Sequence, residues 1–135
     1  MHVFELIQPR RFADERGILE LLEDPRELPF VPKRVFWVTG VPKGDERGFH
    51  AHKVGMQMLF CLKGAIQVRL KTHDEEESLV IDFESPGVWM KNMVWGEQKF
   101  LTDDAILLVV ASNEFDESDY LRDFDSFMKL SEQGF

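Results

Sequence analysis

The chain has 135 residues, of which 44% are apolar and 30% charged, proportions ordinary for a globular protein, so we expect one domain over residues 1–135. Its net charge of −9 argues against nucleic acid as a partner, because phosphate binding needs a basic face. No apolar run approaches the ~20 residues of a membrane span. The first residues lack the regions of a signal peptide and the one cysteine, Cys61, cannot form an internal disulfide, so we expect a cytoplasmic protein.

Short β-strands are predicted through most of the first half of the chain. Strands are expected at 3–7 and 18–22, with turn residues at 14–17 between them. Residues 24–33 carry three prolines, each of which removes a backbone donor, so we expect a loop or an edge crossing there. Further strands, rich in β-branched and apolar residues, are predicted at 34–39, 56–62 and 65–71.

The second half continues the strands and then changes character. The acidic residues 74–77 are interpreted as a solvated hairpin tip. Strands follow at 79–83, 88–90, 98–101 and 105–111. Many short strands separated by Gly and Pro turns predict a β-sandwich or barrel. Residues 116–130 carry apolar residues at helical spacing, so we expect a C-terminal amphipathic helix that packs across the barrel or against a partner subunit.

Two histidines, His50 and His52, stand out because strand residues two apart point to the same face. An imidazole has a pKa of ~6.5 and can both take and return a proton near neutrality. Two neighbouring rings resist double protonation, which keeps at least one available as a base. Such a pair suits proton movement between adjacent carbons of a hydroxyketone, provided that donors hold the enediolate oxygen. The alternative is a structural pair, but the neighbouring Arg47 and Lys53 favour the functional interpretation.

The spacing around the pair resembles the first signature of the cupin superfamily. The pattern runs His-x-His, four residues, Gln57, six residues, Gly64, with glutamine in place of the usual glutamate. The resemblance implies an all-β jelly-roll barrel (a double-stranded β-helix). A metal-binding cupin supplies a further histidine from a later strand, and here none follows His73. Two imidazoles and an amide make a poor divalent-metal site, so we predict no metal and no cofactor, with Glu97 the one residue that could substitute as a ligand.

Six segments resemble the nucleotide-sugar 3,4-ketoisomerases, small cupins that act on dTDP-4-keto-6-deoxyglucose. These segments are 34–37, 46–53, Gln57 with 59–64, 93–97, 105–112 and 115–124. The resemblance implies a metal-free isomerase that converts a 4-keto to a 3-keto sugar through an enediol(ate), in deoxyaminosugar biosynthesis for surface glycans. It also implies a homodimer with exchanged N-terminal strands. The alternatives are a sugar-nucleotide epimerase and a catalytically inactive binding module of the same fold.

The resemblance also implies roles for individual residues. His50 and His52 would carry the proton transfers, and which ring serves which carbon stays open. Arg16 and Arg47 would hold the nucleotide sugar, since an arginine fork suits diphosphate oxygens. The remaining candidate substrate-binding residues are Lys53, Gln57, Trp37, Trp95 and Glu97. Where the family commonly has arginine or histidine after the tryptophan of 94–95, this chain has Gly96.

Overall fold

The computed structural model describes residues 4–134, which form strands, one short 3-10 helix and one α-helix. The elements are β1 (Phe4–Ile7), β2 (Arg10–Asp14), β3 (Gly17–Leu21), β4 (Arg34–Val38), β5 (Glu46–His52), β6 (Gln57–Lys63), β7 (Ala65–Lys71), β8 (Glu76–Asp82), β9 (Gly87–Met90), β10 (Trp95–Phe100), β11 (Ile106–Ala111), η1 (Glu117–Asp119), β12 (Tyr120–Leu121) and α1 (Phe124–Glu132). The predicted loop at 24–33 is free of strand. The first residue of the strand predicted at 3–7 lies outside the described residues.

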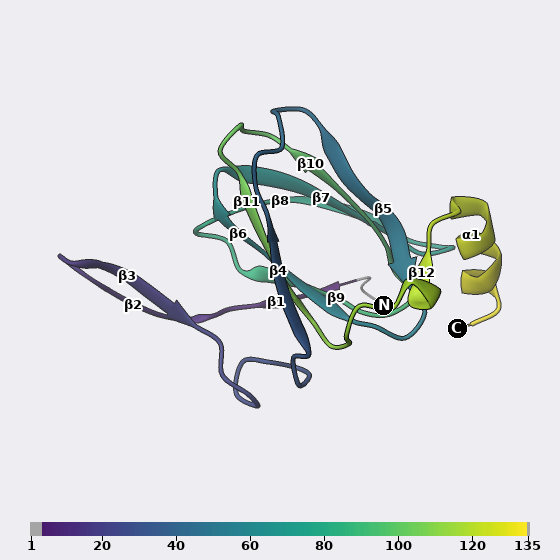
Figure 1. Cartoon of the computed structure of the whole chain (residues 1–135), viewed down its shortest axis with the longest axis horizontal. Helices are drawn as coiled ribbons and strands as arrows, with labels where there is room; N and C mark the ends of the chain where they lie inside the picture. The colour runs from purple at the N-terminus through teal and green to yellow at the C-terminus, as the bar shows by residue number, and fades with distance from the viewer. Residues whose placement is uncertain (1–3, 135) are drawn as a thin grey trace.

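Two five-stranded antiparallel sheets face each other and enclose the core (Figure 1). One has the order β1-β9-β6-β11-β4, here the first sheet, and the other β12-β5-β10-β7-β8, the second sheet. Alternation along β7 shows how the sequence builds this arrangement, because Ile66, Val68 and Leu70 are fully buried while their neighbours are partly exposed. The all-β jelly-roll barrel with a C-terminal helix is therefore confirmed.

The C-terminal helix is shorter than predicted. It begins at Phe124, where the Asp123 side chain caps it by accepting a hydrogen bond from the Ser126 N–H. Residues 120–121 are extended instead, because they pair with His52 and Ala51 of β5 as strand β12. The predicted helical start at 116 is thus wrong, since the apolar residues before 124 serve a strand. Among residues 4–134, no helix is long and apolar enough to cross a membrane.

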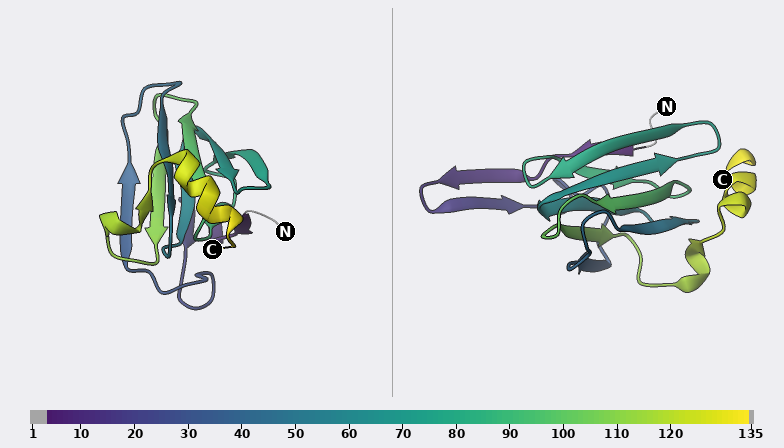
Figure 2. Two further views of the ribbon diagram at one scale, coloured as in Figure 1. Left: turned by 90° about the vertical axis from the view of Figure 1, so that its right-hand side faces the viewer. Right: turned by 90° about the horizontal axis from the view of Figure 1, so that it is seen from above.

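A hairpin of β2 and β3 projects from the barrel. Only these two strands pair in their own small sheet, and they extend away from the body of the molecule (Figure 1). Figure 2 shows that the hairpin and α1 lie at opposite ends of the molecule. Phe12, Ile18 and Leu19 on the hairpin are exposed. A solitary two-stranded hairpin is marginally stable in water, so these apolar side chains indicate that something covers them.

The outer face of the first sheet is also apolar. Part of it is covered by the proline-containing loop, where Leu28 packs with Met58, Phe60 and Val110. The uncovered part exposes further apolar side chains, namely Val35, Trp37 and Leu62. This face and the apolar hairpin are two exposed apolar surfaces of the kind that mark contacts with other proteins.

Candidate active site

The histidine pair is brought together at the end of β5. The rings of His50 and His52 have centroids 5.1 Å apart and lie nearly perpendicular, at 86°. His52 is only 5% exposed, and His50 is half-buried. The ring of Tyr120, on the neighbouring β12, lies 5.0 Å from the ring of His50 and 4.4 Å from that of His52. The predicted shared face of the two imidazoles is therefore realised in a largely buried setting.

A bulge in β5 sets the direction of the pair. Gly48 and Phe49 both have positive φ, of 91° and 62°, and the register with β10 shifts between Gly96 and Glu97. A Cβ atom at Gly48 would lie 2.8 Å from the carbonyl oxygen of Gly96, so only glycine fits there. Bulges re-aim side chains near active sites, and this one precedes His50 directly.

Burial keeps both rings neutral. It is the main reason why the pKa of His52 falls to about 4; the neighbouring His50 lowers this pKa as well, whereas Asp119 raises it. Burial likewise lowers the pKa of His50. At neutral pH both imidazoles are therefore uncharged, and each has one ring nitrogen able to accept a proton.

We expect the folded protein to lose stability as the pH falls from 6.5 to 4, because the unfolded chain binds a proton that folded His52 refuses. The shift to about 4 corresponds to about 3 kcal/mol of unfolding free energy over that window. Chemical denaturation at several pH values will show a shallower pH slope for His52→Asn than for the wild type. The exposed His73 provides the control variant, His73→Asn, which leaves the buried pair intact. Equal slopes in all three proteins would contradict the expectation.

Several residues that the sequence analysis missed gather beside the pair. Arg34, Gln57, Asp119 and Tyr120 line one small hollow together with His52. Gln57, which was predicted, is buried at the start of β6. The other three come from β4, η1 and β12, and Asp119 and Tyr120 entered the sequence analysis only within the segment 115–124. The sequence analysis predicted a helix over these tail residues. It therefore did not predict strand β12, which pairs Tyr120 with His52.

Arg34 supplies the positive charge at this site. Its guanidinium lies 5.0 Å from the ring centre of Phe36 and 5.5 Å from that of Phe115, and it donates a long hydrogen bond of 3.5 Å to the hydroxyl of Tyr120. Its Nε atom is buried and has no hydrogen-bond partner among the described residues. A fixed cation beside neutral imidazoles can stabilise a developing oxyanion.

Trp95 and Glu97 lie elsewhere, on the outer face of the second sheet. Trp95 packs against Phe127 of α1, and its indole N–H donates to Glu97 Oε2 at 2.9 Å. Burial opposes ionisation of Glu97, but hydrogen bonds from Arg69 and Trp95, with the charge of Lys71, leave its pKa below the ordinary value. The structure thus does not bring Trp95 and Glu97 together with the histidines, because odd-numbered residues of β10 face the helix.

The other predicted substrate-binding residues are less buried. Arg47 pairs in register with Gln98, and Gly96 with His50, so Arg47 belongs to the face that carries His50. Lys53 follows β5 and is exposed. Trp37 is 66% exposed on the outer face of the first sheet. Arg16 is at the tip of the projecting hairpin, with its side chain 85% exposed and 2.7 Å from Asp14, so one chain does not bring it to the histidines.

The absence of a side chain at Gly96 leaves room for Met90 in the cavity wall. A Cβ atom at this position would lie 2.8 Å from the sulfur of Met90. The thioether of Met90 therefore occupies space next to the residue that pairs with His50. A larger side chain at 96 would require Met90 to move, so the two positions are coupled.

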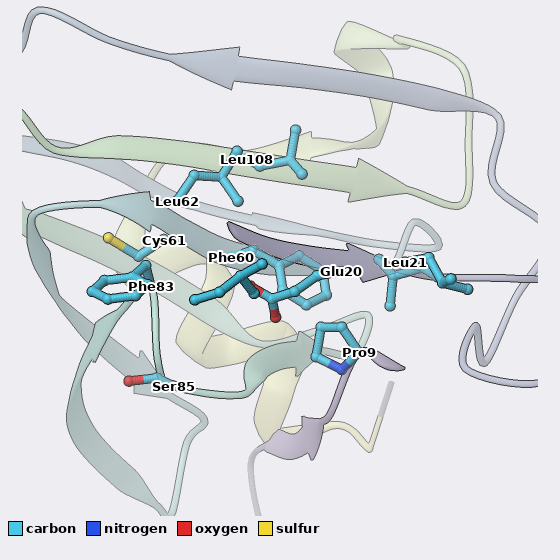
Figure 3. Close-up of a pocket in the computed structure, with 11 residues that line it drawn as sticks. Pro9, Glu20, Leu21, Phe60, Cys61, Leu62, Phe83, Ser85 and Leu108 are labelled. Atoms are coloured by element: carbon cyan, nitrogen blue, oxygen red, sulfur yellow. The ribbon is translucent and has the colours of Figure 1, made fainter. Parts of the chain in front are cut away.

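A groove with largely apolar walls lies away from the histidines (Figure 3). It measures about 330 Å³ and runs between the base of the hairpin and the outer face of the first sheet, with Leu21, Phe60 and Leu108 in its walls. Cys61 also borders it, but burial raises the pKa of this thiol to about 11, so it is not a nucleophile. Within residues 4–134, no three His, Cys, Asp or Glu side chains gather as a metal site would require, and a metal-free enzyme stays a prediction.

Comparisons with known proteins give three consistent results. A family model described as "FdtA: WxcM-like, C-terminal" matches residues 2–132. The curated TDP-4-oxo-6-deoxy-alpha-D-glucose-3,4-oxoisomerase of Aneurinibacillus thermoaerophilus is 34% identical over 125 residues, 93% of this chain and 90% of that protein. QdtA, a sugar 3,4-ketoisomerase from Thermoanaerobacterium thermosaccharolyticum solved with TDP, is 36% identical with a TM-score of 0.94, covering 100% of this chain and 98% of that one. Its histidine-to-asparagine variant, solved with TDP-4-keto-6-deoxyglucose, has a TM-score of 0.95 at the same identity and coverage.

Proposed function

This chain belongs to the FdtA family and is a TDP-sugar 3,4-ketoisomerase, and we propose that His50 and His52 carry the proton transfers of its reaction. The substrate that we assign is a dTDP-4-keto-6-deoxyhexose, and the product is the corresponding 3-keto sugar. The observation that supports these roles is a pair of neutral, largely buried imidazoles with centroids 5.1 Å apart. We place the enzyme in the cytoplasm, in deoxyaminosugar biosynthesis for surface glycans.

The reaction needs only proton carriers. A base removes the proton from C3, and the electrons of the C3–H bond form the carbon–carbon double bond while the C4 carbonyl oxygen takes the negative charge. A proton is then delivered to C4, and the proton of the C3 hydroxyl passes to the C4 oxygen, so that the C3 oxygen becomes the new carbonyl and C4 carries the hydroxyl. Substrate and product are isomers, so no external oxidant or reductant is consumed. Two neutral histidines supply both an acceptor and, once protonated, a donor.

Arg34 and Tyr120 complete the proposed site. The charge of the enediolate develops on oxygen, and a preorganised cation stabilises such charge most strongly where water is excluded. Arg34 has this position beside His52, and the Tyr120 hydroxyl accepts a hydrogen bond from it. We retain Gln57 as a substrate-binding residue because it lines the hollow beside His52, and Arg47 because it lies on the face of β5 that carries His50, with Lys53 just after that strand. Trp95 and Glu97 are instead assigned to the contact with α1.

The same family membership supports a homodimer in which N-terminal strands are exchanged. Arg16 stands on the hairpin at the end of the molecule opposite to α1 and β12, whereas His52 pairs with β12 (Figure 1). A second copy of the chain would cover the apolar hairpin and the exposed Trp37 face together. In that assembly, Arg16 of one protomer would hold the diphosphate in the site of its partner.

A turnover assay with dTDP-4-keto-6-deoxyglucose in deuterated water tests the proposed function. We expect the carbonyl to move from C4 to C3, with deuterium from solvent in the product, and the rate to be unchanged by a chelator. Product NMR distinguishes this from an epimerase, which would invert a centre and leave the carbonyl at C4. Tight binding without exchange would instead indicate an inactive binding module. Loss of activity with chelator would refute the metal-free assignment.

A further inference from the structure

We propose that Asp119 is a positioning residue that holds His52 in the tautomer whose Nε2 atom accepts a proton. The inference rests on the proposed function and deepens it by assigning a state to one of the two histidines. Asp119 ends η1, and its Oδ2 atom lies 3.6 Å from Nδ1 of His52. Both side chains are largely buried, with 11% of the carboxylate side chain and 5% of the imidazole side chain exposed.

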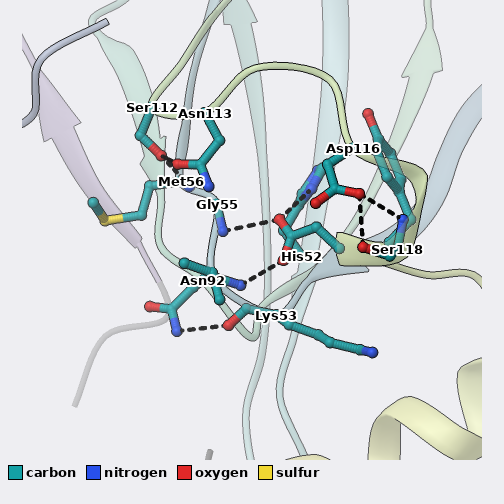
Figure 4. Close-up of polar contacts among 12 residues, drawn as sticks. His52, Lys53, Gly55, Met56, Asn92, Ser112, Asn113, Asp116 and Ser118 are labelled. Atoms are coloured by element: carbon teal, nitrogen blue, oxygen red, sulfur yellow. Dashed lines mark hydrogen bonds and ion pairs between the residues drawn. The ribbon is translucent and has the colours of Figure 1, made fainter. Parts of the chain in front are cut away.

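The carboxylate of Asp119 is held by the loop that follows β5. Figure 4 shows His52 beside Lys53 and Gly55 of this loop. Its Oδ1 atom accepts a hydrogen bond from the Val54 N–H at 2.8 Å, and its Oδ2 atom accepts one from the Gly55 N–H at 3.0 Å. The backbone carbonyl of Asp119 accepts a third, from the Lys53 N–H at 2.9 Å. A Cβ atom at position 55 would lie 2.9 Å from Oδ2, so glycine permits this close approach. The three contacts fix the direction of the carboxylate relative to His52.

This geometry selects one tautomer. A carboxylate accepts hydrogen bonds and does not donate them, so the ring nitrogen that faces it must carry the hydrogen. Nδ1 of His52 is that nitrogen. Nε2 therefore carries the lone pair, and it is buried without a hydrogen-bond partner among the described residues. The 3.6 Å separation exceeds that of a formed hydrogen bond, and catalytic contacts in ligand-free sites commonly tighten only when substrate binds.

Asp119 also makes His52 a better base. The charged and titratable groups that face His52 are His50 on the same strand, Arg34 on β4 and Asp119 at the end of η1. The ring of Tyr120 lies beside His52, tilted by 60°. Burial lowers the pKa of His52, as do His50 and Arg34, whereas Asp119 raises it. When Nε2 accepts a proton, the resulting imidazolium faces the negative charge of Asp119. A carboxylate that orients a catalytic histidine and stabilises its protonated form has large kinetic consequences in other enzymes.

The test compares Asp119→Asn with the wild type and with Asp123→Asn. Asp123 is the control, because it is a nearby carboxylate of the tail whose side chain accepts hydrogen bonds from Ser126 at the start of α1 instead of facing His52. For Asp119→Asn we expect kcat to fall by about 10²-fold, with KM changed by only a few-fold. The acidic limb of the kcat profile should move to lower pH, since the group that raises the pKa of His52 is gone. Asp123→Asn should keep the wild-type kcat and the wild-type acidic limb.

Nitrogen-15 NMR of the histidine rings decides the tautomer without depending on turnover. We expect the wild-type signal of His52 to report Nδ1–H, and Asp119→Asn to lose that preference. A wild-type signal that reports Nε2–H would overturn the inference even if the enzyme turns over as proposed. An unchanged kcat in Asp119→Asn, or a reduced kcat with an unmoved acidic limb, would overturn it as well. Failure of the proposed function would appear separately, as a wild type without solvent exchange that still shows the Nδ1–H tautomer.

Discussion

Replacement of His50 or His52 by asparagine is expected to lower kcat by about 10²- to 10⁴-fold, the range that a positioned acid or base contributes. Asparagine keeps a polar side chain of similar reach but has no nitrogen that binds a proton near neutrality. The two sheets are held together by strands such as β4, β6 and β10, which the substitutions on β5 leave unchanged, so the variants should fold. The nucleotide contacts are proposed to come mainly from arginines, and TDP affinity should therefore change by only a few-fold.

Deuterium incorporation separates the two rings. If one histidine removes the C3 proton, its asparagine variant will neither exchange that position nor move the carbonyl. If the other histidine protonates C4 or relays the hydroxyl proton, its variant will exchange C3 with solvent but form product slowly. His73→Asn is the matched control, because His73 lies in the turn between β7 and β8 and contacts Ser131 of α1. Full activity in both variants of the pair would eliminate acid–base catalysis by these histidines.

The sequence was sufficient for the parts of the structure that depend on local pattern. Residues 65–71 alternate strictly, and β7 alternates in burial as that pattern requires. His50 and His52 share a face because a strand repeats every two residues, and the bulge lies before the pair rather than within it. Gln57 is close to His52 because only a short turn separates the end of β5 from the start of β6.

Features that depend on contacts between distant segments could not be predicted in the same way. Tyr120 has helical spacing to Phe124 and Phe127, yet it is extended because β5 offers an open edge. Trp95 and Glu97 flank Gly96 in the sequence, but alternation along β10 places them on the outer face of the second sheet, where Trp95 packs against α1. Gly96 faces the interior of the barrel, next to Met90. The role of Asp119 depends on its contact with His52, a residue 67 positions earlier in the chain, and no spacing rule connects the two (119 − 52 = 67).

The hairpin gives the second large expected effect, through complementation between two impaired variants assayed at a substrate concentration below the wild-type KM. In the proposed dimer, Arg16→Ala damages the site of the partner, whereas His50→Asn damages the site of its own barrel. A heterodimer of the two variants then has one site with both residues intact and one site with neither. When the two chains are co-expressed and pair at random, about one quarter of all sites should be complete, and activity should recover to about that fraction of the wild type.

A matched control removes the geometric basis of the recovery. His50→Asn and His52→Asn each damage the barrel of the chain that carries them. Their heterodimers therefore contain no complete site and should stay inactive. Arg16→Ala alone should raise KM by about 10- to 10²-fold, the cost of losing a charged hydrogen bond to phosphate. Recovery with Arg16→Ala and His50→Asn, but not with the two histidine variants, requires that Arg16 of one chain reaches the site of another. In one chain the Arg16 side chain is 85% exposed. Activity no greater than the sum of the separate variants would show that Arg16 does not cross between protomers, and the diphosphate would then have to be held by Arg47 and its neighbours within one barrel.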